Sequence, residues 1–202
     1  MQQLKGPVLS SRLSAVLLQA VSFAGEQLSL LLEREITLQG TNLRSLRLEE
    51  LPDFLDDGAE DRDVVGVHLS FSGDADGHVI LSFSPDSALR LAAHVMMMDP
   101  SEVTEMTDME RSVLGEVGSI TAASFLTAVA DACRLVLHPS PPTVVEEMIG
   151  ALLSKVLGEM AIEAPQAVLL HTVLHLDADQ LQGDLMLLPS ASACALVEVR
   201  LA

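Results

Sequence analysis

The chain has 202 residues, 49% of them hydrophobic and 2% aromatic, and a formal net charge of −18. This length suits one domain with a large core, which must be built from Leu, Val, Ala and Met because aromatic residues are so few. The acidic balance argues against nucleic acid and anionic membranes as partners, since both are normally bound through a basic patch.

The sequence also bears on the cellular compartment. The first residues lack the long apolar region of a signal peptide, and no uninterrupted apolar run reaches the length needed to span a bilayer. Cys133 and Cys194 lie in apolar stretches without Cys-x-x-Cys spacing, which favours two reduced thiols over a disulfide. We therefore expect a cytoplasmic protein without membrane contact.

Helical and strand periods alternate in the first half of the chain. A strand near residues 35–38 and an acidic loop over residues 48–63 are expected, followed by a β-hairpin over residues 64–84 around the turn DADG. A helix then begins with Ser84 as its cap and Pro85 in its first turn. Residues 10–33 predict an earlier helix, whose buried side carries Leu13, Val16, Leu17, Ala20, Ala24, Leu28 and Leu31.

The second half predicts a similar series of elements. Thr107 and Glu110 have the spacing of a capping box and begin a long helix that ends near Ala132. The run TVVEEMIGALLSKVLGEMAI, residues 143–162, has a helical period and predicts another helix. Residues 167–176 and 181–189 predict two strands, and a last helix follows over residues 190–202.

The two halves share a sequence pattern. GHVILSFSPDSALRLA and GDLMLLPSASACALVE have the same order of glycine, apolar strand, proline and small-residue helix. We infer an internal duplication within a single domain, residues 1–202, with half-repeats at about 10–99 and about 101–202. Because hairpins and short turns link the strands, the expected fold class is α+β, with the long helices of both halves packed on a shared antiparallel sheet.

One side of the long helix in the second half carries the candidate site. With about 100° of turn per residue, Ser112, Glu116 and Ser119 fall within an arc of about 60°. Gly115 and Ala123 flank this stripe and should leave it accessible to the backbone of a partner. The pattern alone also suits the solvated side of an amphipathic helix. The opposite, buried side is expected to carry Leu114, Val117, Phe125, Ala128 and Ala132.

The same residues form part of a longer motif. Ser112, Glu116 and Ser119 have the spacing Ser-x-x-x-Glu-x-x-Ser, and Pro141 or Pro142 follows just over twenty residues later. This motif, together with GEVGSITAASFLTAVADA and PSPPTVVEEMIGALL, resembles the CheC/CheX/FliY family of chemotaxis phosphatases. The family signature is Asp or Ser, three residues, Glu, two residues, Asn and a later Pro. The resemblance extends over essentially the whole chain.

The resemblance implies a CheC-like fold and hydrolysis of the phospho-aspartate of the response regulator CheY. It also implies that Glu116 pairs with the regulator's active-site Lys, and that Ser119 lies where the family's Asn orients the attacking water. No cofactor of the chain's own is implied, because the regulator supplies Mg²⁺. Catalysis would consist of water positioning and electrostatics.

Two positions depart from the family. The hydroxyl of Ser119 is shorter than an Asn side chain and cannot present a carbonyl acceptor and an NH₂ donor together, so we expect weak hydrolysis. In the first half, LSLLLEREI aligns with the family and puts Ser11, Ala15 and Leu18 at the three signature positions. Ala15 and Leu18 can neither pair with a Lys nor hold a water, so at most one active surface is expected.

The segment after the prolines suggests a second binding residue. It resembles the helix that in CheC proteins is associated with binding the receptor deamidase CheD, and Glu147 takes the place of an Asp in that helix. The alternative interpretation is an amphipathic helix with Glu146 and Glu147 on its solvated side.

Histidines and acidic residues near the end of the chain raise the question of a metal. His171 and His175, with Asp177 and Asp179 nearby, would share one face of a strand, and a solvated face is the simpler interpretation. The DADG turn lacks the later ligands of a calcium loop. We expect no metal site.

Two functions are therefore predicted. The first is a protein-aspartate phosphatase that acts on a CheY-type response regulator in chemotaxis or two-component signalling, with Glu116 and Ser119 in its site and Ser112 and Glu147 as binding residues. The alternative is a non-catalytic binding module for a receiver domain or for CheD.

Overall fold

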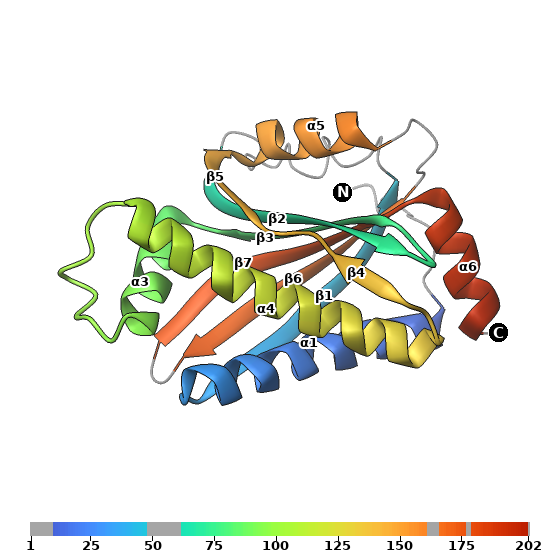
Figure 1. The fold of residues 1–202 in the computed structure, drawn as a ribbon, viewed down its shortest axis with the longest axis horizontal. Coiled ribbons are helices and arrows are strands. Elements are labelled where there is room, and N and C mark those ends of the chain that lie inside the picture. The colour runs from blue at the N-terminus through green and yellow to red at the C-terminus, as the bar shows by residue number, and fades with distance from the viewer. Residues whose placement is uncertain (1–9, 48–61, 161–165, 177–178, 202) are drawn as a thin grey trace, which may run out of the picture.

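The computed structural model describes residues 10–47, 62–160, 166–176 and 179–201 (Figure 1). The first half contains α1 (Ser11–Leu32), β1 (Ile36–Arg47), β2 (Asp63–Gly73), β3 (Gly77–Phe83) and α3 (Pro85–Val95). The second half contains α4 (Asp108–Cys133), β4 (Leu137–Pro139), β5 (Thr143–Met148), α5 (Ile149–Glu159), β6 (Gln166–Leu176), β7 (Asp179–Pro189) and α6 (Ala191–Leu201).

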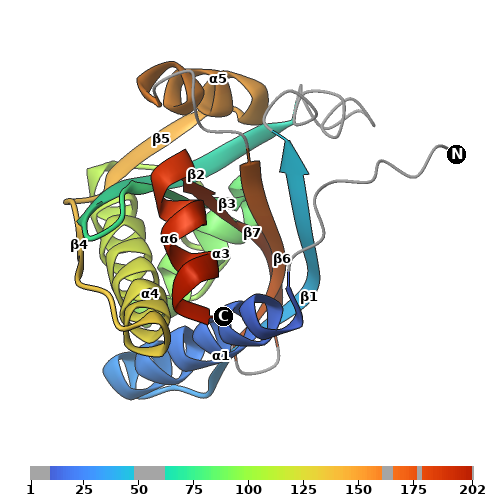
Figure 2. The same cartoon turned by 90° about the vertical axis from the view of Figure 1, so that its right-hand side faces the viewer.

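The described strands form one antiparallel sheet. Its order is β1-β6-β7-β3-β2-β4, and β5 also pairs with β2. Helices α1 and α4 lie side by side along one face, and α5 lies on the opposite face (Figures 1 and 2). The predicted α+β class, with long helices packed on an antiparallel sheet, is confirmed.

The strand order has an internal symmetry. Apart from the three-residue β4, which has no counterpart, exchanging β1 with β5, β2 with β6 and β3 with β7 leaves the pairings along the sheet unchanged. A duplicated half would produce this order, and we propose that residues 10–99 and 101–202 are two half-repeats of one domain.

Two apolar clusters occupy the two faces of the sheet. The larger cluster joins the sheet to α1, α3, α4 and α6 and includes Leu17, Val67 and Phe125. The smaller cluster lies under α5, where Leu152 packs with Ile80 and other buried residues. Each of the five side chains named is less than 2% exposed, so burial of the apolar faces on both sides of the sheet stabilises the fold.

Several local predictions are confirmed. Ser84 accepts the backbone N–H of Ser87 at 3.2 Å and caps α3. Thr107 and Glu110 form the capping box of α4, in which the Glu110 carboxylate accepts the backbone N–H of Thr107 at 2.9 Å. The DADG turn joins β2 to β3, with Gly77 at a φ of 158°, a value that favours glycine.

The helix predicted over residues 143–162 is wrong at its start. Residues 143–148 form β5, which pairs with β2, and α5 begins only at Ile149. Val144 packs against the larger apolar cluster, on the α4 side of the sheet, and Val145 against the smaller one, under α5. This alternation is typical of a strand with both faces covered. Adjacent β-branched residues favour this extended conformation, and the available edge of β2 decides it.

The long helices and the first strand differ in detail from the prediction. Leu31, placed on the buried side of the first helix, is 55% exposed near the end of α1, and Ala132 is exposed although the next residue, Cys133, is buried. The strand expected near residues 35–38 continues to Arg47 as β1. Most of the predicted acidic loop, residues 48–61, lies outside the described residues.

The expectation about membrane-spanning length also needs correction. Helices α1 and α4 are long and apolar enough to cross a membrane by length and composition alone. In the fold, the most apolar 18-residue segment of α4 is 56% buried, and that of α1 is 33% buried. The core helices of water-soluble proteins meet the same criteria, so this finding assigns no membrane contact.

Candidate functional site

The candidate stripe lies on the outer side of α4. Ser112 and Glu116 are exposed, and Ser119 is half-buried beside them. Leu114, Val117 and Phe125 are buried on the opposite side, against the sheet. The helix therefore holds the Glu116 carboxylate away from the core, where a partner can reach it.

Glycines on the inner side of α4 bring the helix close to the sheet. A Cβ added to Gly118 would lie 2.4 Å from Cγ1 of Val67 on β2, so only glycine fits this approach. Gly115 is buried, and a Cβ there would lie 3.7 Å from Cγ of Pro142 and 3.4 Å from Cγ2 of Val144. The prediction that the helix is open at Gly115 is wrong, because Pro142 and Val144 of β5 cover this glycine, although Ser112 and Glu116 are exposed.

Pro142 thereby lies beside the helix that carries Glu116. The sequence predicted Pro141 or Pro142 as part of the motif, and the structure brings Pro142 next to the residue that precedes Glu116. The proline helps to fix the chain between β4 and β5 against α4, because its ring restricts the backbone.

An ion pair adjoins the stripe. Arg111, the residue before Ser112, pairs with Glu146 of β5, and both side chains are 40% exposed. Sequence reasoning missed this contact, because residues 35 positions apart are brought together only by the pairing of β5 with β2. The interpretation of Glu146 as a solvated helix residue is wrong in that it lies on a strand and has a cationic partner.

Glu147 lies on the other side of β5 from this ion pair. Successive side chains of a strand point to opposite faces of the sheet. Glu147 therefore lies on the same face as Val145, which packs against the cluster under α5. The side chain is half-buried, and its Oε1 atom is inaccessible to solvent without a hydrogen-bond partner among the described residues. Glu147 and Glu116 therefore belong to different surfaces of the molecule.

The corresponding positions on α1 are also on the outside. Ser11 and Ala15 are exposed, and Leu18 is 38% exposed. The three positions of the first half thus lie on an exposed side of α1, but neither Ala15 nor Leu18 carries a carboxylate or an amide.

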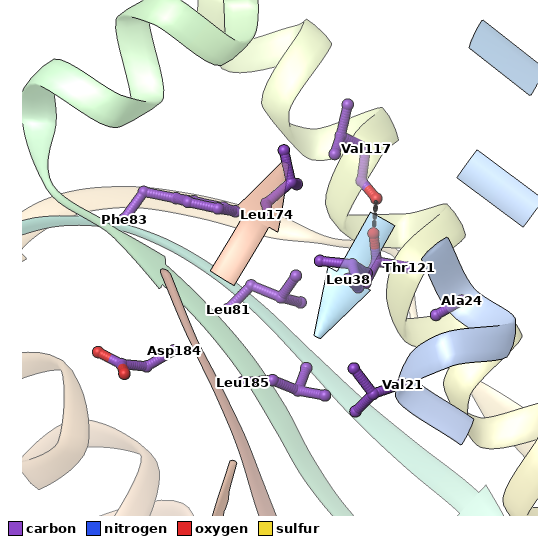
Figure 3. Close-up of a pocket in the computed structure, with 10 residues that line it drawn as sticks. All are labelled: Val21, Ala24, Leu38, Leu81, Phe83, Val117, Thr121, Leu174, Asp184 and Leu185. Carbon is purple, nitrogen blue, oxygen red and sulfur yellow. Dashed lines mark hydrogen bonds between the residues drawn. The ribbon is translucent and has the colours of Figure 1, made fainter. Parts of the chain in front are cut away.

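One small interior space lies among the described residues. A space of about 10 Å³ beneath α1 and α4 is lined mainly by apolar side chains, including Val21, Leu38 and Val117 (Figure 3). The Thr121 hydroxyl there donates to the carbonyl of Val117 at 2.7 Å. The carboxylate of Asp184 points away from this space (Figure 3) and accepts from Arg62 at 3.0 Å. The volume is at the lower limit for one water molecule.

A shallow groove of about 400 Å³ separates α1 from the C-terminal half of α4. It is lined by small, apolar and polar residues, namely Val16, Gln19, Ala20, Phe23, Ala128, Asp131 and Ala132. Neither this groove nor the interior space includes Glu116, which lies exposed on the outer side of α4.

No metal centre is found within the described part of the chain. No three His, Cys, Asp or Glu side chains gather there at metal-binding distance. The side chain of His171 and the residue Asp177 lie outside the described residues, and His175 is half-buried on β6.

Sequence comparisons point to one family. The family profile described as "Chemotaxis phosphatase CheX" matches residues 65–155, which include α4 and β5. The chain is 29% identical over 163 residues to the CheY-P phosphatase CheC of Bacillus subtilis, with 79% of this chain and 77% of that protein covered.

Solved structures share the fold at lower sequence identity. FliY of Thermotoga maritima superposes with a TM-score of 0.75 at 14% identity, covering 96% of this chain and 98% of that one. The FliM middle domain of H. pylori gives a TM-score of 0.64 at 10% identity, covering 95% and 99%. The profile and the CheC relative show that the chain is similar to chemotaxis phosphatases of the CheX and CheC type, and the FliY and FliM structures share its fold.

Proposed function

We propose that the protein hydrolyses the phospho-aspartate of a CheY-type response regulator, and that it does so weakly. The relative in Bacillus subtilis is named a CheY-P phosphatase, and the family signature is kept at Ser112 and Glu116. We also propose a cytoplasmic location, where such a regulator would be found.

The observation that carries this proposal is the exposed carboxylate of Glu116 on the outer side of α4. The helix is fixed from behind by Gly118 on β2 and from the side by Pro142. A carboxylate on a rigid helix can pair with a Lys in a partner's active site without a large loss of conformational entropy.

The chemistry proposed for this surface needs no cofactor held by the chain. The regulator would supply Mg²⁺, Glu116 would pair with its active-site Lys, and Ser119 would lie near the attacking water. A serine hydroxyl offers one donor and a short reach, and a water misplaced by about 1 Å lowers the rate by on the order of 100-fold. This is the physical reason for expecting weak hydrolysis.

The test follows phosphate loss from phosphorylated CheY-type receivers of the same organism. Ser119→Asn should raise kcat by on the order of 10- to 100-fold, because the amide restores an acceptor and a donor at the right reach. Glu116→Gln should lower kcat/KM by about 10-fold or more through loss of the ion pair. The phosphatase proposal is refuted if neither the wild-type chain nor Ser119→Asn accelerates the spontaneous loss from any of these receivers.

A non-catalytic binding module is the second candidate, and two observations favour it. Ser119 lacks the amide, and the first-half surface carries Ala15 and Leu18. On this hypothesis, Glu147, which is half-buried on β5, contributes to binding CheD, as the resemblance to CheC proteins implies.

Binding assays separate the two candidates. A module would bind a receiver or CheD with no turnover, and Ser119→Asn would leave it inactive. Glu147→Gln should weaken the binding of CheD but not of the receiver, because Glu147 and Glu116 lie on different surfaces. Equal loss of both partners in that variant would contradict the assignment of Glu147.

A further inference from the structure

We propose that Met109 and Met148 form an apolar flank of the Glu116 stripe and pack against the CheY-type receiver domain. This inference rests on the proposed function and extends its docking surface beyond the motif residues. It is carried by the position, exposure and chemistry of the two side chains.

Met109 lies in line with Glu116 on α4. It precedes Glu116 by seven residues, which corresponds to about 10 Å along the helix axis and about 20° around it. Its side chain is 63% exposed, whereas the next residue of the helix, Glu110, is buried. A partner that reaches Glu116 along the outer side of α4 therefore meets Met109 at the start of the helix.

Met148 reaches the same surface from β5. Val144 packs beside Gly115, and Glu146 pairs with Arg111, so β5 runs antiparallel to α4 along its side (Figure 1). Because alternate residues of a strand share a face, Met148 continues this row toward the first turn of α4. There its side chain is 47% exposed. The Arg111–Glu146 pair lies next to this patch, two residues from each methionine.

The chemistry of this patch fits an apolar surface beside a lysine. The chain carries a net charge of −18, but Arg111 and Glu146 neutralise one another beside this patch, and its two thioether side chains are uncharged. Methionine is unbranched and polarisable and adapts to a partner's shape. Single exposed apolar residues are common, but these two flank the same stripe from different elements.

The experiment measures binding of the Mg²⁺- and beryllofluoride-activated receiver to the full chain. Met109→Gln and Met148→Gln are compared with Glu116→Gln and with Val199→Gln as the matched control. Val199 is 74% exposed on α6, at the other end of the molecule (Figure 1). Thermal unfolding of each variant checks that the fold is kept, as expected for exposed positions.

We expect each methionine variant to raise Kd about fivefold or more, and the double variant to raise it further, while Val199→Gln stays within twofold. If Glu116→Gln weakens binding but both methionine variants behave like Val199→Gln, the inference is wrong and the proposed function stands. If the wild-type chain binds no activated receiver, the proposed function fails and the inference fails with it.

Discussion

At the scale of single residues, Gly118 sets the distance between α4 and the sheet. Its missing side chain lets Val67 of β2 lie against the helix backbone. The neighbouring Gly115, one turn earlier, has room for a Cβ at ordinary contact distance from Pro142 and Val144. Two glycines that look equivalent in sequence therefore have different consequences for packing.

We predict opposite effects for alanine at these two positions. Gly118→Ala should lower the free energy of unfolding by about 1–3 kcal/mol, because the added Cβ meets Val67 at 2.4 Å in a packed core. Gly115→Ala should be neutral or stabilise by up to about 1 kcal/mol, because alanine is the better helix former. Denaturant unfolding measures both changes. Equal destabilisation by the two variants would contradict this account of α4 packing.

At the scale of an element, α4 depends on its capping box. The Thr107 hydroxyl accepts the backbone N–H of Met109 at 3.2 Å and donates to the carboxylate of Glu110. That hydroxyl, followed by the backbone N–H groups of Glu110 and Thr107, lowers the pKa of the Glu110 carboxyl. The charged carboxylate thus satisfies donors that the first turn of a helix leaves without partners.

This lowered pKa predicts an acid-sensitive helix start. Because the folded chain favours the charged form of Glu110, the stabilisation is present above the ordinary titration range of a glutamate, about pH 4. It is lost as the pH falls through that range toward the lower pKa of the folded state. Between about pH 7 and about pH 3.5, the wild type should lose more stability than Glu110→Gln. Urea midpoints measure this, and equal losses would refute the role of Glu110.

At the scale of the whole molecule, burial separates the two cysteines. Neither forms a disulfide within the described residues, but Cys133 at the end of α4 is 1% exposed, and Cys194 on α6 is half-buried. Burial raises the pKa of the Cys133 thiol, which lowers the fraction of reactive thiolate at any given pH.

Thiol labelling should therefore report the integrity of the fold. In the native protein, Cys133→Ser, which keeps Cys194, should react with a thiol reagent faster than Cys194→Ser, which keeps Cys133. The second variant should react quickly only when denaturant unfolds the chain. Rapid native labelling of Cys133 would show that α4 does not pack as described.

Local sequence determined the parts of this fold that depend on neighbours in the chain. The caps at Ser84 and Thr107, the hairpin around DADG and the exposed position of Glu116 depend on short-range spacing and could be predicted. The family motif also pointed to α4, because its spacing places the signature residues on one side of a helix.

The tertiary structure decided what depends on distant neighbours. Residues 143–148 have a helical period in sequence, but the edge of β2 draws them into β5, because backbone pairing and two covered faces outweigh a weak helical preference. That pairing brings Glu146 to Arg111, places Pro142 beside the helix and turns Glu147 to another surface. The sequence by itself determined which helix carries the candidate site, whereas contacts between residues far apart in the chain decided what surrounds it.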